Sequence, residues 1–207
     1  VESAVVSSKA SSLFGDKLVT NHTYFDRAYG LNPGVAGIPA VHVFSANGLY
    51  DPDITGVGHQ PMGFDEISLF YDHYTVIRAN IVLDFNNGDA TYLQYVGVYV
   101  ADAPSLALSY TEIIENGNCV YGLLGMSSES TNKATIKFSV DIGDFTGRRN
   151  LLDEDDLRGD VSNNPAEQVY FHVFGFPNTS ADSGTISFAA RLEYETIWTE
   201  PKKLSGS

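Results

Sequence analysis

ANGLYDPDITGVGHQPMGFDEISLFYDHY, residues 46–74, joins two segments with the character of β-strands. The stretch opens with the Asn, Asp, Pro and Gly residues that form turns. It closes with an aromatic run in which Phe64, Ile67 and Tyr71 recur at helical spacing, so a short helix is predicted over residues 64–72. A connection of this length in a compact domain is usually functional or held by packing of its own.

The segments around this loop alternate apolar and polar residues, which is typical of half-buried strands. Over residues 133–142, for example, Phe138 is predicted to face the core and Lys137 the solvent. The run Asn-Asn-Gly-Asp at 86–89 predicts a tight hairpin, and a capping box at Ser109 predicts a second short helix. Eight strands are expected, over residues 17–25, 40–46, 74–85, 91–101, 119–126, 133–142, 168–176 and 184–198.

The composition fits one all-β domain of 207 residues, because Tyr and Phe contribute 12 each and turn-forming Gly contributes 19. Charged residues make up only 18%, which favours either a surface covered by partners or a stable β protein with a polar, uncharged surface. The single cysteine, Cys119, excludes an intrachain disulfide and a cysteine-based zinc site. No apolar run approaches the ~20 residues of a membrane span, so no membrane partner is expected. We expect a flexible lead-in over residues 1–15, one domain over 16–200 and a tail over 201–207.

The opening stretch follows the pattern N-x-L/C-Y-D-P-D-x-T-G-x-G-H-Q-P-x-G-F-D, with an aromatic helix and Y-x-x-Y after it. The residues that carry this pattern are Asn47, Leu49, Tyr50, Asp51, Pro52, Asp53, Thr55, Gly56, Gly58, His59, Gln60, Pro61, Gly63, Phe64, Asp65, Tyr71 and Tyr74. The pattern resembles the capsid proteins of small circular, Rep-encoding single-stranded DNA viruses. The end of the chain, YETIWTEPK at 194–202, is similar to the last strand and tail of those proteins.

This resemblance implies an eight-stranded, two-sheet antiparallel jelly roll with two short helices in loops. It also implies a viral coat protein, not an enzyme, that self-assembles into an icosahedral shell around the genome. Such a protein is found in the virion and, during assembly, in the host cell. Its partner is itself, in about 60 copies for the smallest shell or about 180 for a larger one. The loop residues expected to contact a neighbouring subunit are Asn47, Tyr50, Asp51, Asp53, Thr55, His59, Gln60 and Pro61.

The net charge of −14 predicts that this domain repels nucleic-acid phosphates. Viral nucleic acid is therefore expected to bind through a basic arm upstream of Val1, of the kind that the resembled family usually carries. The basic pairs at 148–149 and 202–203 are interpreted as ordinary solvated surface.

Two pairs of residues suggest a metal or catalytic site, and each has a simpler interpretation. His42 and His59 lack the H-x-H arrangement of a cupin-like metal site, so a histidine that caps or bridges a loop is favoured. Asp51 and Asp53 resemble the paired carboxylates of a glycosidase, but carboxylates in a turn more commonly bind backbone amides. No catalytic residue and no cofactor site is therefore predicted.

Two alternatives stay open. The first concerns an acidic run, which is interpreted either as a solvated loop or as a functional site. The functional site would be a Ca²⁺ site or a charged contact between subunits, and the run consists of Asp153, Glu154, Asp155, Asp156 and Asp160. The whole chain is alternatively a carbohydrate-binding β-sandwich of the lectin or fibre-tip type, because its aromatic residues, acidic turns and low charge fit that function too.

Overall fold

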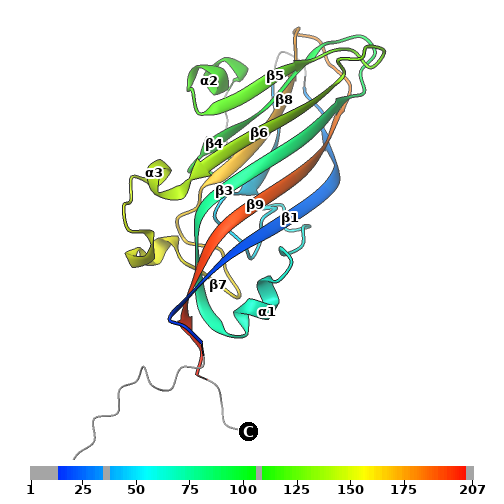
Figure 1. Ribbon diagram of the computed structural model, residues 1–207. Coiled ribbons are helices and arrows are strands. Elements are labelled where there is room, and N and C mark those ends of the chain that lie inside the picture. Colours follow the sequence, from blue (N-terminus) through cyan, green and yellow to red (C-terminus); the bar gives the residue numbers. More distant parts are fainter. Residues whose placement is uncertain (1–13, 35–37, 106–108, 204–207) are drawn as a thin grey trace, which may run out of the picture.

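The structure, a computed structural model, describes residues 14–34, 38–105 and 109–203, and these form two antiparallel β-sheets packed face to face (Figure 1). The strands are β1 (Lys17–Leu31), β2 (Ala40–Ser45), β3 (Tyr71–Asn87), β4 (Gln94–Ala101), β5 (Cys119–Leu124), β6 (Lys133–Asp141), β7 (Gly159–Asp160), β8 (Tyr170–Pro177) and β9 (Ile186–Pro201). The α-helices are α1 (Phe64–Ser68), α2 (Tyr110–Glu115) and α3 (Ile142–Thr146), and two 3-10 turns lie at Leu151–Asp153 and Asp155–Leu157.

The strand order is that of a jelly roll. One sheet has the order β1-β9-β3-β6, with β7 beside β3, and the other has the order β2-β8-β4-β5. Apart from β4 and β5, which are neighbours in one sheet, consecutive long strands lie in opposite sheets, so the chain wraps around the main core. A smaller buried cluster is separate from it and consists of Tyr99, Ala101, Ile113, Phe174 and Phe176. The predicted eight-stranded, two-sheet antiparallel jelly roll is confirmed, with the two-residue β7 as an addition.

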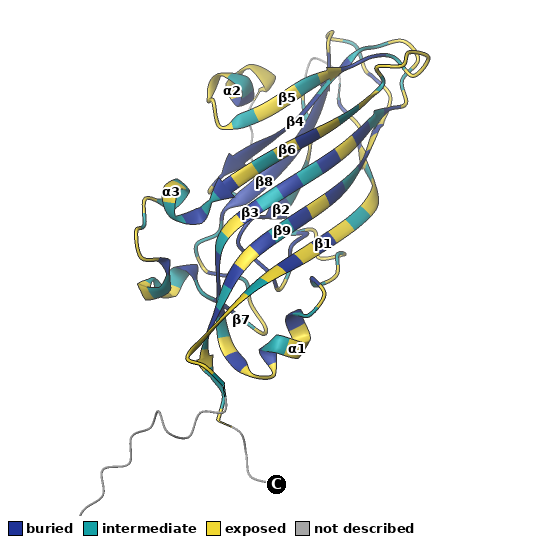
Figure 2. Ribbon diagram, viewed as in Figure 1, coloured by how far each residue is buried: buried dark blue, intermediate teal, exposed yellow. Residues whose placement is uncertain are grey.

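The core lies between the sheets and is filled from alternate positions of each strand. Figure 2 shows this alternation along β3 and β9, the central strands of the first sheet. In β9 the side chains of Phe188, Leu192 and Tyr194 are buried, as the pattern of residues 184–198 predicts. Phe138 packs against the same core but is only half-buried, whereas Ile136 and Val140 on the same face of β6 are buried.

The turn predicted at residues 86–89 is not a hairpin. β3 and β4, on either side of it, belong to different sheets, and Gly88 does not have the positive φ that a type I′ turn requires. Instead the buried side chain of Asn87 donates to the carbonyl oxygens of Tyr92 (3.0 Å) and Gly125 (2.9 Å). Asn87 therefore fixes the point where the chain crosses from one sheet to the other.

The helices also differ from the prediction. α1 ends at Ser68 instead of residue 72, because Tyr71 already begins β3. The described residues contain three α-helices where two were predicted. The third, α3, begins where the side chain of Asp141 accepts a hydrogen bond from the backbone N–H of Asp144 (3.1 Å), an N-cap that interrupts the alternation of residues 133–142.

The predicted lead-in over residues 1–15 and tail over 201–207 lie largely outside the described residues, and the domain limits stay predictions. Across the described ranges, no helix has both the length and the apolar character needed to cross a membrane.

Candidate functional site

The loop over residues 46–63 lies at the end of the sandwich that also carries α1 and β7 (Figure 1). Its first half is buried and is held by the segment before β8. Asn47 Nδ2 donates to the carbonyl of Glu167 (2.9 Å), and Asn47 Oδ1 accepts from the N–H of Val169 (3.0 Å). The Tyr74 hydroxyl accepts from the N–H of Leu49 (3.0 Å). The buried half of the motif is thus a fixed support for the half that follows.

Asn164, which was not among the predicted site residues, completes this support. Its Oδ1 accepts from the N–H of Asp51 (3.1 Å), and its Nδ2 donates to the carbonyl of Asp51 (2.9 Å). Gly48 is required beside it, because a Cβ at that position would overlap with the Asn164 carboxamide. The contacts span 113 residues, so no local sequence pattern signals them.

Asp53 sets the turn in the middle of the loop, as predicted. It is buried, and its Oδ1 accepts from the N–H (3.2 Å) and the hydroxyl (2.8 Å) of Thr55. Its Oδ2 accepts from the Tyr29 hydroxyl (3.1 Å), and His42 Nε2 lies 3.2 Å from Oδ1. Asp51 joins the loop through its backbone, and burial together with the charge of Asp53 raises the pKa of its carboxyl group. These contacts support the structural interpretation of the Asp53 carboxylate, whereas Asp51 is held through its backbone groups.

His59 bridges the second half of the loop to β1. Its Nδ1 lies 2.9 Å from the carbonyl of Gln60 and its Nε2 lies 3.1 Å from the carbonyl of Phe25. The ring also stacks on Tyr24, with centroids 4.6 Å apart. Only the doubly protonated imidazolium donates through both nitrogens. The hydrogen bonds to Gln60 and Phe25 accordingly raise the pKa of His59.

The residues predicted to contact a neighbouring subunit fall into three groups by exposure. The side chains of Asn47, Asp53 and Pro61 are buried within the chain, Asp51 and Gln60 are half-buried, and Tyr50, Thr55 and His59 are exposed. The same loop exposes two apolar side chains, Val57 (82%) and Met62 (91%), and Leu69 just after α1 is also exposed (67%). Contact with a neighbour through this end of the molecule stays a prediction.

The acidic run is neutralised at least in part by arginine within the chain. Arg148 pairs with three carboxylates: Glu154 (2.6 Å), Glu167 (3.4 Å) and Asp156 (3.6 Å). Within the residues that the structure describes, no group of three or more His, Cys, Asp or Glu side chains is arranged to hold a metal. In the other basic pair Lys202 is engaged, since its Nζ donates to the carbonyl of Ser68 (2.7 Å). Neither Arg148 nor Lys202 is therefore a free cation for nucleic acid.

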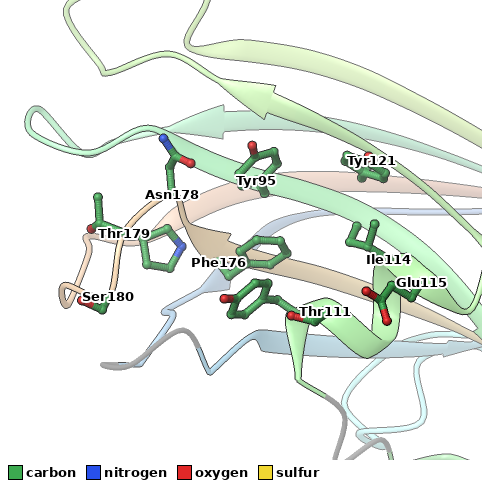
Figure 3. Close-up of a pocket in the computed structure, with 11 residues that line it drawn as sticks. Tyr95, Thr111, Ile114, Glu115, Tyr121, Phe176, Asn178, Thr179 and Ser180 are labelled. Carbon is green, nitrogen blue, oxygen red and sulfur yellow. The ribbon is translucent and has the colours of Figure 1, made fainter.

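A cavity of about 560 Å³ lies on the outer face of the β2-β8-β4-β5 sheet, the face turned away from the main core. It is bounded by α2 and by the segment after β8 (Figure 3). Tyr95 of β4, Tyr121 of β5 and Phe176 of β8 point into it. This cavity was not predicted from the sequence, because its lining comes from four separate segments. A local sign of the cavity lies in β5, where the large side chains of Tyr121 and Leu123 are on the solvent-facing side of the strand.

No family model matches the chain, and no curated protein matches it in sequence. Solved structures of viruses do match it in fold. A semi-empty VLP of the giant freshwater prawn Macrobrachium rosenbergii nodavirus is similar with a TM-score of 0.54 and 12% identity, over 94% of this chain and 99% of that one. A second structure of the Macrobrachium rosenbergii nodavirus has a TM-score of 0.53 and 13% identity, over 100% of this chain and 60% of that one. The decameric BFDV capsid protein has a TM-score of 0.46 and 9% identity, over 88% and 99%. At these identities the two nodavirus structures, with TM-scores above 0.5, show the fold alone, a jelly roll of the kind found in viral capsids.

Proposed function

We propose that this chain is the shell domain of a small viral coat protein, which assembles with copies of itself into an icosahedral shell around the genome. The observation that carries the proposal is the single jelly roll, which the nodavirus particle shares over 94% of this chain. The motif over residues 47–74 supports the finer assignment to a small Rep-encoding single-stranded DNA virus. For such a virus we favour the smallest shell, of about 60 copies, in the virion.

The exposed apolar end of the sandwich supports assembly. Val57, Met62 and Leu69 are apolar side chains that this end of the molecule leaves in water, and covering them in a subunit contact would remove that apolar area from water. The contacts of Asn47 and Asp53 hold the loop in one conformation before any neighbour arrives, which lowers the entropic cost of forming a contact. We therefore assign this end of the molecule to a contact between subunits.

Genome binding is assigned to a basic arm upstream of Val1 and not to the domain itself. The domain has 26 acidic and only 12 basic residues. Among the basic residues, Arg148 and Lys202 already bind partners within the chain. Affinity for nucleic acid depends on cations that neutralise phosphates, and the domain offers few.

The proposal is tested by placing a charge on the exposed loop. Val57→Asp and Met62→Asp change side chains that are at least four-fifths exposed, so the thermal stability of the subunit should stay unchanged. We expect both variants to lose the large assemblies that sedimentation velocity detects for the unaltered chain. Ile38→Asp, a control at the opposite end of the sandwich with 63% exposure, should still assemble. Full assembly by the loop variants would contradict the assignment of this loop to a contact between subunits.

A further inference from the structure

Four aromatic rings that line the cavity form a continuous row, and Figure 3 shows three of them, Tyr95, Tyr121 and Phe176. Tyr121 contacts Tyr95 edge-on (centroids 6.3 Å apart), Tyr95 stacks on Phe176 (5.1 Å), and Phe176 faces Tyr110 (5.2 Å). The rings at the two ends of the row are open to solvent, Tyr110 with 44% and Tyr121 with 49% of its surface exposed. A volume of about 560 Å³ lies within the ~300–1,000 Å³ that is typical of small-molecule sites.

Both walls of the cavity are fixed within the chain. On one side, α2 begins at a capping box in which the Glu112 carboxylate accepts from the backbone N–H of Ser109 (2.8 Å), and Ile113 is buried beneath the helix. On the other side, the N–H of Asn178 donates to the carbonyl of Leu93 (2.9 Å). The cavity therefore exists before a ligand binds, which limits the ordering that binding requires.

The rim of the cavity is polar but carries no positive charge. Its polar residues are Thr111 and Glu115 of α2, and Asn178, Thr179 and Ser180 after β8. Lys, Arg and His are absent from the described residues that line it, and the chain as a whole has a net charge of −14. The site thus offers hydroxyl, amide and carboxylate groups to a ligand, and it repels an anionic one.

We propose that this cavity binds a neutral oligosaccharide, whose sugar rings lie along the aromatic row and whose hydroxyls bond to the rim. Sugar rings have apolar C–H faces that pack on aromatic side chains, and hydroxyls at their edges that suit Glu115 and Asn178. A proline-rich peptide would use the aromatic row but leave much of the polar rim unpaired. A nucleotide would bring its phosphate charge close to Glu115.

This inference goes beyond the proposed shell function and does not depend on it. The four aromatic rings and the polar rim are contributed by this chain, so saccharide binding can be measured on an unassembled subunit. Saccharide binding by a chain that never assembles would leave this inference standing and contradict the proposed shell.

The first test is a glycan array that carries neutral, sialylated and sulfated oligosaccharides, probed with the full 207-residue chain. We expect binding to neutral members and none to sulfated ones. The strongest neutral member then serves as the ligand for calorimetric titration. An array on which folded protein binds no neutral glycan, or prefers sulfated ones, overturns the inference, as does binding of a proline-rich peptide at the same rings.

Variants locate the site. Tyr110→Ala and Tyr121→Ala should each weaken the affinity about tenfold, because each removes one end of the aromatic row. Glu115→Gln, which keeps the shape of the rim, should weaken it about threefold. Val120→Ala is the matched control, since Val120 neighbours Tyr121 on β5 with its side chain on the opposite face of the sheet. Unchanged affinity in both tyrosine variants, at unchanged thermal stability, places the ligand elsewhere and overturns the inference.

Discussion

Single side chains hold the long loop in place by pairing with the backbone of distant segments. Asn164 binds both the N–H and the carbonyl of Asp51, and Asn47 bridges Glu167 and Val169 in the same way. A buried backbone group that loses its partner costs about 1–3 kcal/mol, so each of these amides has a measurable effect on the loop. The small residue Gly48 makes room for one of them.

Gly48→Ala should lower the free energy of unfolding by about 1–3 kcal/mol, because the added methyl group overlaps with Asn164. Gly122→Ala is the control, since its new methyl group meets nothing within 4 Å and the backbone there has no positive φ. Urea denaturation of the two variants measures the difference. Equal stability would mean that Asn164 does not pack against Gly48.

His59 should make the loop sensitive to pH. Its pKa is raised in the folded state, first by the hydrogen bond to Gln60. A raised pKa means that the stabilisation is fully present below the unfolded value of about 6.5 and is lost as the pH rises through the folded pKa. The difference in melting temperature between the unaltered chain and His59→Gln should therefore shrink from pH 5.5 to pH 8.5. A difference that stays constant over this range would show that the imidazolium is not the form that bridges the loop.

At the scale of strands and helices, the buried face of a strand could be predicted from the sequence, but the strands with which it pairs could not. The alternation in residues 184–198 is a local property, and β9 buries the predicted side chains. The hairpin predicted at 86–89 is wrong, because β4 pairs with β5 and β8 instead of β3. Strand pairing depends on contacts between segments that are distant in the sequence. The long loop could be recognised from the sequence because its motif is contiguous. The aromatic cavity could not be predicted, because its lining comes from four separate segments.

Phe138→Ala tests the edge strand β6. Full burial of a phenylalanine would predict a cost of about 3–5 kcal/mol, but Phe138 is half-buried, so we expect about 2 kcal/mol. Lys137→Ala, on the opposite face, should change the stability by less than about 0.5 kcal/mol. Chemical denaturation gives both values. Equal costs would contradict the register in which Phe138 lies opposite Ile81.

At the scale of the whole molecule, charge separates the shell from the genome contact. With a net charge of −14, the 207-residue chain should not bind single-stranded DNA in a filter-binding salt titration at moderate ionic strength. The same domain with a basic arm added upstream should bind, with an affinity that falls steeply with salt. Tight, salt-sensitive binding by the chain alone would assign the genome contact to the domain.

Assembly into a closed shell is tested most directly by the mass of the purified chain in solution. Multi-angle light scattering near neutral pH and at moderate salt should show a particle of about 1.35 MDa, since about 60 copies of a 22.5 kDa chain form the smallest closed shell. A larger closed shell would correct only the number of copies. A single species of 22.5 kDa at every salt, pH and calcium concentration tested would contradict the proposed function.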